Sequence, residues 1–244
     1  SLSVLENLSR EEIIEEIKSN LEADGVKIYP YNDVYSYVQT IEADQKVLLS
    51  KANVNSRLVS NIPAEVTILD EENLTLLPKA IKNETEVENE RTAHIKDGVA
   101  VTRFIRWMKE TVGKEKITEL SAAKKLYQFR SEQENFLGDS FDPIIAYGKH
   151  AAIVHYSATE ETDIPLEDRG MVLADTGGHY LEGTTDITRT IALGTLTQEE
   201  KEMYTTVLKG HIQLETARFL QGCSGQSLDI LARTPLWEKG LDYN

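Results

Sequence analysis

The chain has 244 residues, enough for one large domain or two small ones with a substantial apolar core. Its net charge of −15 repels a nucleic-acid backbone, and no Lys/Arg cluster offsets that charge, so we expect no nucleic-acid partner. The single cysteine excludes an internal disulfide and fits a reducing compartment, and we expect a cytoplasmic location. No run reaches the roughly 18 apolar residues of a membrane span, so we expect no membrane partner.

The first part of the chain alternates predicted helices and strands. A capping box at Ser9 to Glu12 opens a helix that Gly25 can end. The pattern then predicts strands at 26–29, 47–49 and 66–69 and helices at 33–41 and 54–59. This order is typical of a parallel α/β fold. A change of pattern near 77–83 places a domain boundary between residues 1–78 and residues 79–244.

The second domain is predicted to be α+β. Helices are expected at about 84–111 and 117–133, followed by strands at 171–174 and 187–191 and by helices at 198–220 and 227–238. We expect Lys124, Lys125 and Arg130 to form a solvated face of the second of these helices, and Trp107 to be a packing residue.

Two acids lie eleven residues apart within the predicted hairpin, Asp175 and Asp186. If the chain turns near Leu181 to Gly183, the two acids lie opposite or diagonal to each other, where cross-strand side chains are about 5 to 8 Å apart. Two divalent cations about 3.5 to 4 Å apart would convert the repulsion of the acids into ligation and could activate water for hydrolysis. Such hard oxygen ligands suit manganese and similar ions. A hairpin with two solvated acids is the alternative.

The sequence of the hairpin, residues 174–190, is ADTGGHYLEGTTDITRT. It resembles the first metal-ligand motif of the pita-bread metallopeptidases, and within them the Xaa-Pro aminopeptidase (aminopeptidase P) group. The resemblance implies a pita-bread catalytic domain after a non-catalytic α/β domain. It also implies that Asp175 chelates one metal ion and that Asp186 bridges two metal ions. We expect both ions to be Mn²⁺. Family members often form homodimers, so a homodimer is a further expectation.

An earlier run, residues 140–156, reads SFDPIIAYGKHAAIVHY. It resembles the strand-loop-strand that precedes the motif in this family, in which a His-Tyr pair closes the second strand. The resemblance gives His155 a catalytic role on the substrate or proton side, a task suited to imidazole, and a structural role is the alternative. The remaining histidines are predicted to be structural: His94, His150, His179 and His211.

The family's metal site also needs a His from a His-Gly-x-Gly-His segment and two Glu from later strands, and these are absent from the sequence. The last residues, 237–244, resemble the stretch that precedes the His segment. We therefore expect the chain to be a fragment, truncated within its catalytic domain and inactive alone.

The resemblance implies a dinuclear metallo-aminopeptidase that releases the N-terminal residue from peptides with proline in second position, by attack of a metal-bridging hydroxide. A prolidase-type Xaa-Pro dipeptidase, a methionine aminopeptidase and a non-enzymatic pita-bread binding module, as in a histone chaperone, stay open as alternatives. The run from Gly183 to Thr190 and the preceding α/β part favour aminopeptidase P over the other two peptidases. Intact Asp175 and Asp186 argue against metal-free creatinase and the binding module.

Overall fold

The computed structural model describes residues 10–243, and side chains from Ile14 onward. The chain divides into two compact units, Ser1–Ile81 and Lys82–Asn244. The domain boundary predicted between residues 78 and 79 falls inside a short helix, α5 (Leu76–Ala80), and stays a prediction. The capping box predicted at Ser9 lies outside the described residues.

The first unit is organised around two parallel strands, β1 (Lys46–Leu49) and β2 (Thr67–Asp70). Helix α4 (Ser56–Ser60) connects them, and its cap is Asn55, whose side chain accepts a hydrogen bond from the Arg57 backbone N–H at 2.8 Å. The parallel pairing confirms the α/β prediction for this part. Its other elements are α2 (Arg10–Ala23), the 3-10 turn η1 (Tyr31–Asp33), α3 (Val34–Val38) and α5, and its buried core is Val38, Leu49, Ile62 and Val66.

The strand predicted at residues 26–29 is wrong. These residues have no regular secondary structure, and the side chains of Val26, Ile28 and Tyr29 are exposed. β-Branched and aromatic residues favour an extended chain, but a strand also needs a neighbour to pair with. Within the described residues, the sheet of this unit contains β1 and β2 alone.

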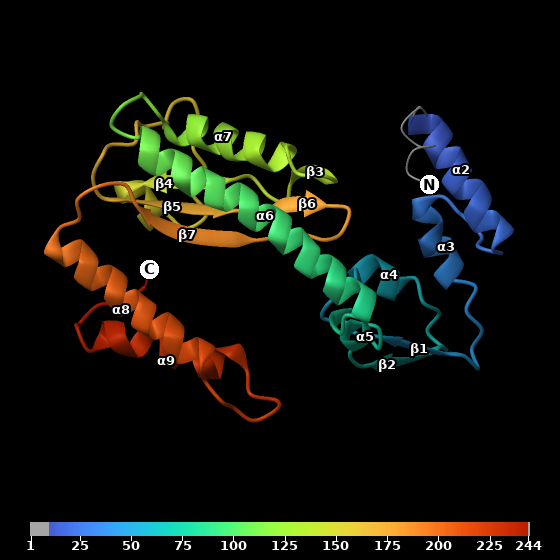
Figure 1. Ribbon diagram of the computed structural model, residues 1–244. Helices are drawn as coiled ribbons and strands as arrows, with labels where there is room; N and C mark the ends of the chain where they lie inside the picture. Colours follow the sequence, from blue (N-terminus) through green and yellow to red (C-terminus); the bar gives the residue numbers. More distant parts are fainter. Residues whose placement is uncertain (1–9, 244) are drawn as a thin grey trace. The chain divides into compact units, whose positions relative to one another are not determined.

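Two helices open the second unit, and Figure 1 shows them lying side by side over a sheet. Helix α6 (Glu84–Thr111) begins with a capping box in which Asn83 and Glu86 exchange hydrogen bonds. Helix α7 (Glu119–Ser131) begins with the corresponding exchange between Thr118 and Ser121. Both caps satisfy backbone N–H groups that have no partner inside the helix.

The sheet beneath these helices has three antiparallel strands in the order β4-β5-β7 (Figure 1). They are β4 (Ile144–Tyr147), β5 (Met171–Thr176) and β7 (Ile187–Ala192), and a separate antiparallel pair joins β3 (Phe136–Asp139) to β6 (Gly178–Tyr180). The strands predicted at 171–174 and 187–191 are confirmed. Strand β6 was not predicted, since its three residues are too few to show a period of two.

Alternation along β5 determines which side of the sheet faces the core. Val172 and Ala174 are 0% and 5% exposed and pack in one cluster with the α6 residues Phe104 and Met108 and the α7 residue Leu126. Successive side chains of a strand point to opposite faces. Met171, Leu173 and Asp175 therefore lie on the face away from this cluster, while Thr176, 1% exposed, lies on the same face as Val172 and Ala174.

The strand predicted to end at His155 and Tyr156 is wrong. After β4 the chain forms the 3-10 turn η2 (Gly148–Ala152) and then a further turn, in which the Tyr156 N–H donates to the Ile153 carbonyl at 3.2 Å. Gly148 has a φ of 54°, which takes the backbone out of the extended conformation at the point where a strand would continue.

Two helices follow the sheet, α8 (Gln198–Glu215) and α9 (Gly225–Trp237), and they pack against each other. Their contact is close at Gly210, where an added Cβ would lie 2.2 Å from the Ala232 carbonyl oxygen. Both helices were predicted, but α8 ends five residues before the predicted residue 220.

Candidate metal centre

The pairing of β5 with β7 brings the two predicted metal ligands to one face of the sheet. Asp175 lies opposite Thr188, and Asp186 lies one residue before the start of β7. Asp186 is thus two residues from the position opposite Asp175, on the same face, in the diagonal relation that spans about 7 to 8 Å. This is one of the two arrangements that the sequence pattern allows.

Both carboxylates are open to a ligand on this face. Asp175 is half-buried and its Oδ1 accepts a hydrogen bond from the Thr188 hydroxyl at 2.7 Å, while Asp186 is exposed. Carboxylate and hydroxyl oxygens are hard donors, which fit a divalent ion such as Mn²⁺ in type. They supply only part of its ligands, because a hard divalent ion takes about six, and residues 10–243 contain no group of three or more His, Cys, Asp or Glu placed to hold a metal.

The turn between the two acids is anchored to α6. The backbone groups of Tyr180 and Gly183 bond to each other, which confirms the turn predicted near Leu181 to Gly183. Lys96 donates to Glu182 Oε1 at 2.6 Å and Asn135 donates to the same oxygen at 2.8 Å. These two hydrogen bonds, with that of Lys96 the stronger, lower the pKa of Glu182 below its ordinary value.

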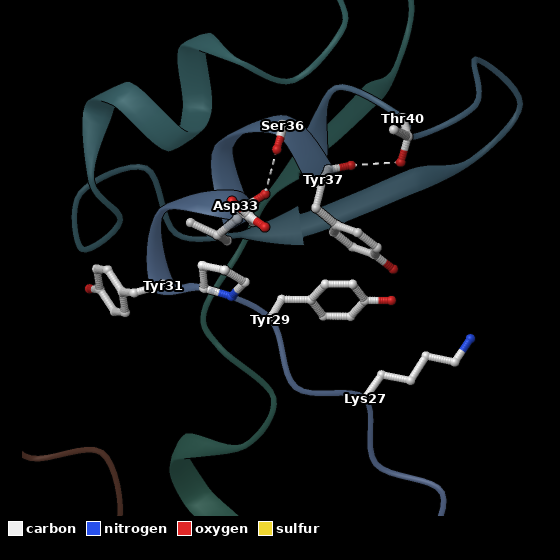
Figure 2. Close-up of a pocket in the computed structure, with 9 residues that line it drawn as sticks. Lys27, Tyr29, Tyr31, Asp33, Ser36, Tyr37 and Thr40 are labelled. Atoms are coloured by element: carbon white, nitrogen blue, oxygen red, sulfur yellow. Dashed lines mark hydrogen bonds between the residues drawn. The ribbon is translucent and has the colours of Figure 1, made fainter. Parts of the chain in front are cut away.

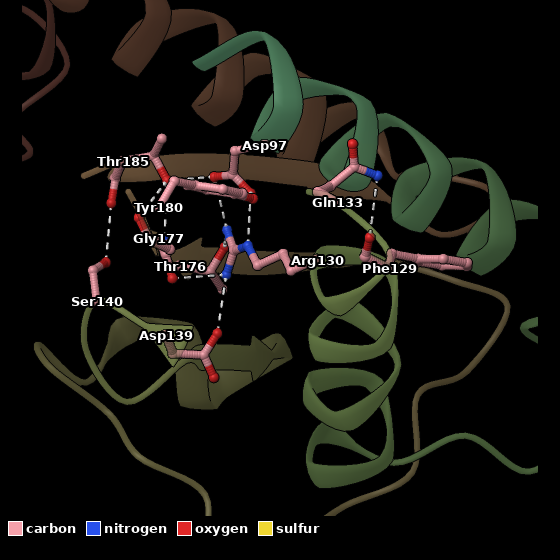
Figure 3. Close-up of polar contacts among 11 residues, drawn as sticks. Asp97, Phe129, Arg130, Gln133, Asp139, Ser140, Thr176, Gly177, Tyr180 and Thr185 are labelled. Atoms are coloured by element: carbon pink, nitrogen blue, oxygen red, sulfur yellow. Dashed lines mark hydrogen bonds and ion pairs between the residues drawn. The ribbon is translucent and has the colours of Figure 1, made fainter. Parts of the chain in front are cut away.

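A buried ion pair lies under the hairpin (Figure 3). Arg130 of α7 and Asp97 of α6 are both 0% exposed, and Arg130 Nε donates to Asp97 Oδ1 at 2.7 Å. The prediction that Arg130 belongs to a solvated face is therefore wrong. The sequence does hold a signal, because Arg130 follows the apolar Leu126 by four residues and so lies on the same helix face.

The same network perturbs two titratable neighbours. Burial is the largest cause of a raised pKa at Tyr180, with the negative charge of Asp97 the next contribution. Burial also raises the pKa of Asp139, although the nearby Arg130 guanidinium partly opposes the shift. The interior beneath the acids is therefore a low-dielectric region, in which the charges of Asp97 and Arg130 are paired with each other.

His155 lies apart from the two acids. It is exposed on the turn after η2 and has a φ of 54°. Within residues 10–243, no hydrogen bond or ion pair joins it to Asp175 or Asp186. The end of β4 that leads to this turn, Tyr147, pairs with Val172, three residues from Asp175 and so about 10 Å along the strand.

A second buried acid, Glu119, holds the segment that carries His155. Glu119 is 0% exposed and accepts hydrogen bonds from the Tyr147 N–H at 2.8 Å and the Tyr156 hydroxyl at 3.0 Å. His150 Nδ1 lies 3.0 Å from Glu119 Oε1, and its ring lies 4.5 Å from the ring of Tyr156. Sequence reasoning missed Glu119, because an acid in the first turn of a helix is ordinarily a solvated one that complements the helix dipole.

The other three histidines have local partners. His94 Nδ1 lies 2.9 Å from the Glu90 carbonyl oxygen, and His179 Nδ1 lies 2.9 Å from the Thr184 hydroxyl. His211 lies 4.0 Å from Glu215 on α8. The structural role predicted for these three histidines stays a prediction.

The first unit contains a hollow of about 710 Å³ beside the coil that precedes α3 (Figure 2). Tyr29, Tyr31 and Tyr37 line it together with Lys27 and Asp33. The three tyrosines are 62%, 89% and 68% exposed, so the hollow is an open aromatic surface and holds none of the predicted site residues.

The fold defines a two-part protein in which an α/β unit precedes, in sequence, an α+β unit with two carboxylates on one sheet face. The model of metallopeptidase family M24 matches residues 88–244, and that of the creatinase/prolidase N-terminal domain matches residues 7–86. The chain therefore belongs to metallopeptidase family M24. This match confirms the predicted family.

Similar proteins are Xaa-Pro aminopeptidases. Xaa-Pro aminopeptidase 1 of Dictyostelium discoideum is 39% identical over 90% of this chain and 35% of its own length. Aminopeptidase P1 of Arabidopsis thaliana is 34% identical over 97% of this chain and 44% of its own length. The chain thus spans well under half the length of these relatives.

Solved structures show the same fold. The crystal structure of X-prolyl aminopeptidase from Caenorhabditis elegans, described as a cytosolic enzyme with a di-nuclear active site, is 32% identical with a TM-score of 0.86, over 97% of this chain and 40% of that one. The Xaa-Pro dipeptidase from Bacillus anthracis is 23% identical with a TM-score of 0.65, over 85% of this chain and 57% of that one, and shows the fold alone. These likenesses confirm the predicted pita-bread fold class. No helix in residues 10–243 is long and apolar enough to cross a membrane.

We expect the Glu119 cluster to be sensitive to loss of its carboxylate. Replacing Glu119 with Leu removes the side-chain acceptor of the Tyr147 N–H, at about 1 to 3 kcal/mol, and leaves the Tyr156 hydroxyl with the Thr162 hydroxyl as its acceptor at 3.2 Å. Hydrogen exchange of the Tyr147 amide should therefore become much faster. The matched variant Glu119→Gln keeps a carbonyl oxygen and should show a smaller change. Equal exchange rates in Glu119→Leu and the unmodified protein would contradict this role.

Proposed function

We propose that the protein is a metal-dependent aminopeptidase that releases the N-terminal residue from peptides with proline in second position. The observation that carries the proposal is the placement of Asp175 and Asp186 on one open face of the β5–β7 hairpin. The family match supports a metallopeptidase, and the names of the relatives support the preference for proline. A cytoplasmic location is proposed because the Caenorhabditis elegans relative is described as cytosolic. A homodimer is proposed from the family resemblance alone.

Asp175 and Asp186 would hold a pair of divalent cations, which we propose to be Mn²⁺. The Thr188 hydroxyl already engages Asp175 Oδ1, which suits Asp175 to contact a single ion through its other oxygen. The exposed Asp186 is suited to bridge both ions. When bound, two such ions would lower the pKa of a water molecule and so supply a nucleophile for hydrolysis of the peptide bond.

His155 is proposed to act on the substrate side. Its exposed position on a turn leaves the imidazole accessible to a peptide, and the Glu119 cluster fixes the residues on either side of it. From there the ring could hydrogen-bond the substrate or transfer a proton, tasks for which an imidazole is suited near neutral pH.

A dipeptidase specific for Xaa-Pro is the main alternative within enzymes, since a protein of that activity has the same fold. The two activities differ in substrate length, so a tripeptide Xaa-Pro-Xaa and a dipeptide Xaa-Pro distinguish them. A non-enzymatic binding module is disfavoured because both acids are intact.

We expect Asp175→Asn and Asp186→Asn to lower metal content and remove nearly all activity in the complete protein. The amide keeps the shape of the carboxylate but loses the negative charge that holds a cation. Metal analysis of the purified variants by mass spectrometry is the measurement. Asp229→Asn on α9, an acid that pairs with Arg233, is the control and should keep its metal. Full metal occupancy in both site variants would disprove the assignment.

His155→Ala should reduce kcat by about 10² to 10⁴ in the complete protein, the usual contribution of a positioned general acid or base. Its Mn²⁺ content should stay unchanged, since the proposed role lies away from the metal. His179→Ala, which removes another exposed histidine of the same unit, should retain full activity. Equal turnover with and without the His155 imidazole would leave that residue with a structural role.

The 244-residue chain alone should show no appreciable peptidase activity and only weak metal binding. Two carboxylates leave most positions around each ion unfilled, so the water is not made acidic enough to attack. Hydrolysis of an Xaa-Pro-Xaa tripeptide with added Mn²⁺ is the measurement, with the Caenorhabditis elegans enzyme as the positive control. Comparable turnover by both would show that the two acids suffice.

A further inference from the structure

The buried pair Asp97–Arg130 makes contacts beside each of the two acids. Its two members come from different helices, and Arg130 forms a fork on the carboxylate, with Nε 2.7 Å from Oδ1 and Nη2 3.1 Å from Oδ2 of Asp97. A two-pronged contact of this kind fixes the orientation of both groups as well as their separation. The pair also contacts the hairpin, and Arg130 Nη1 lies 3.5 Å from Asp139 Oδ1 on β3 (Figure 3).

The guanidinium holds the end of β5. Arg130 Nη2 donates to the Thr176 hydroxyl at 3.0 Å, and Nη1 donates to the Gly177 carbonyl at 3.0 Å. Thr176 follows Asp175 directly and is 1% exposed. Because neighbouring side chains of a strand point to opposite faces, a Thr176 side chain held in the interior places Asp175 on the open face.

The carboxylate holds the start of β7 in the same way. Thr185 donates to Asp97 Oδ2 at 2.6 Å and is 1% exposed, and it directly precedes Asp186. The Ser140 hydroxyl donates to the Thr185 carbonyl at 3.0 Å, which adds a second restraint on this residue. One ion pair therefore reaches the neighbour of each acid from the buried side of the sheet.

The two hairpin segments also approach each other closely at this point. A Cβ added to Gly177 would lie 2.0 Å from the Thr185 carbonyl oxygen. The network thus restrains a narrow part of the hairpin, where a small shift of either segment would change the distance between Asp175 and Asp186. Two like charges held close together repel, so a restraint is needed to keep them at the separation that two cations require.

We propose that Asp97 and Arg130 are positioning residues that set the separation of Asp175 and Asp186 and thereby the affinity of the site for a pair of divalent cations. The inference rests on the proposed function. A buried ion pair contributes little net stability compared with apolar residues of similar volume, so the pair is not needed simply to hold α6 against α7. What apolar residues cannot supply is the set of directed hydrogen bonds to Thr176 and Thr185.

The test uses two substitutions that each remove one hydroxyl and leave the ion pair in place, Thr176→Val and Thr185→Val. The complete protein is titrated with Mn²⁺ alone by calorimetry, and the electron paramagnetic resonance spectrum reports the coupling between the two bound ions. We expect Kd to rise about 10- to 100-fold, the usual cost of losing a partner behind a metal ligand. Thr185→Val should weaken the binding of both ions, because Thr185 precedes Asp186, which is proposed to contact both. Thr176→Val should weaken mainly the binding of the one ion that Asp175 is proposed to contact. The coupling should change in both variants.

Two further variants distinguish positioning from general loss of stability. Thr185→Ser restores the hydroxyl and should recover both the affinity and the coupling. Thr206→Val removes another buried hydroxyl, one that bonds to the Glu202 carbonyl within α8, and should leave Mn²⁺ binding unchanged. A loss of affinity in Thr206→Val equal to that in Thr185→Val would overturn the proposal.

The double variant Asp97→Leu/Arg130→Met removes the pair itself and should fold but bind Mn²⁺ at least 10-fold more weakly. If it fails to fold, the single threonine variants decide the question. Unchanged affinity and coupling in both threonine variants, with metal lost in Asp175→Asn, would overturn the positioning role and leave the proposed function intact. Unchanged metal binding in Asp175→Asn and Asp186→Asn would overturn the proposed function itself.

Discussion

The register between β5 and β7 is the constraint on which both the core and the site depend. With Asp175 opposite Thr188, the alternation of β5 places Val172 and Ala174 against α6 and α7 and Asp175 on the opposite face. A shift of one residue would exchange the two faces, burying the acid and exposing the apolar side chains. The free energy of core burial therefore also determines where the carboxylate points.

In the second unit, the buried charged side chains fix local geometry, whereas the buried apolar side chains stabilise the core. Asp97 and Glu119 are both 0% exposed, and the oxygens of each accept several hydrogen bonds, so neither carries the full cost of an unpaired buried charge. Such networks add little to net stability but allow few alternative arrangements. They lie where the chain must be held in one geometry: at the ends of the hairpin strands and at the turn that carries His155.

The elements that depend on interactions between residues close in sequence could be predicted. The long helix α6, the strands of the hairpin and the turn between them follow from capping residues, from periods of 3.6 and 2, and from glycine. The acids could be paired from sequence because a hairpin joins nearby segments. The helix expected from residue 117 starts at Glu119 because Thr118 provides the cap.

The features that could not be predicted depend on contacts between distant segments. An arginine is expected to face solvent because a buried charge needs a partner. The partner of Arg130 is Asp97, 33 residues earlier on another helix, and the pattern around Arg130 does not reveal it. Residues 26–29 have strand composition but no partner strand among residues 10–243. The chain leaves the extended conformation at Gly148, and the turn that follows is held by Glu119 of α7, which accepts hydrogen bonds from Tyr147 and Tyr156.

Helix α7 links the two polar networks, because Glu119 is its first residue and Arg130 lies in its last turn. The two residues are eleven positions apart, which at 1.5 Å per residue corresponds to about 16 Å along the helix. Glu119 holds Tyr147 at one end of the β4–β5 ladder and Arg130 holds Thr176 at the other. The two ends of α7 therefore contact the segment that carries His155 and the strand that carries Asp175. The sheet face that carries Asp175 and Asp186 is open, but the Asp97–Arg130 pair that holds their neighbours is buried.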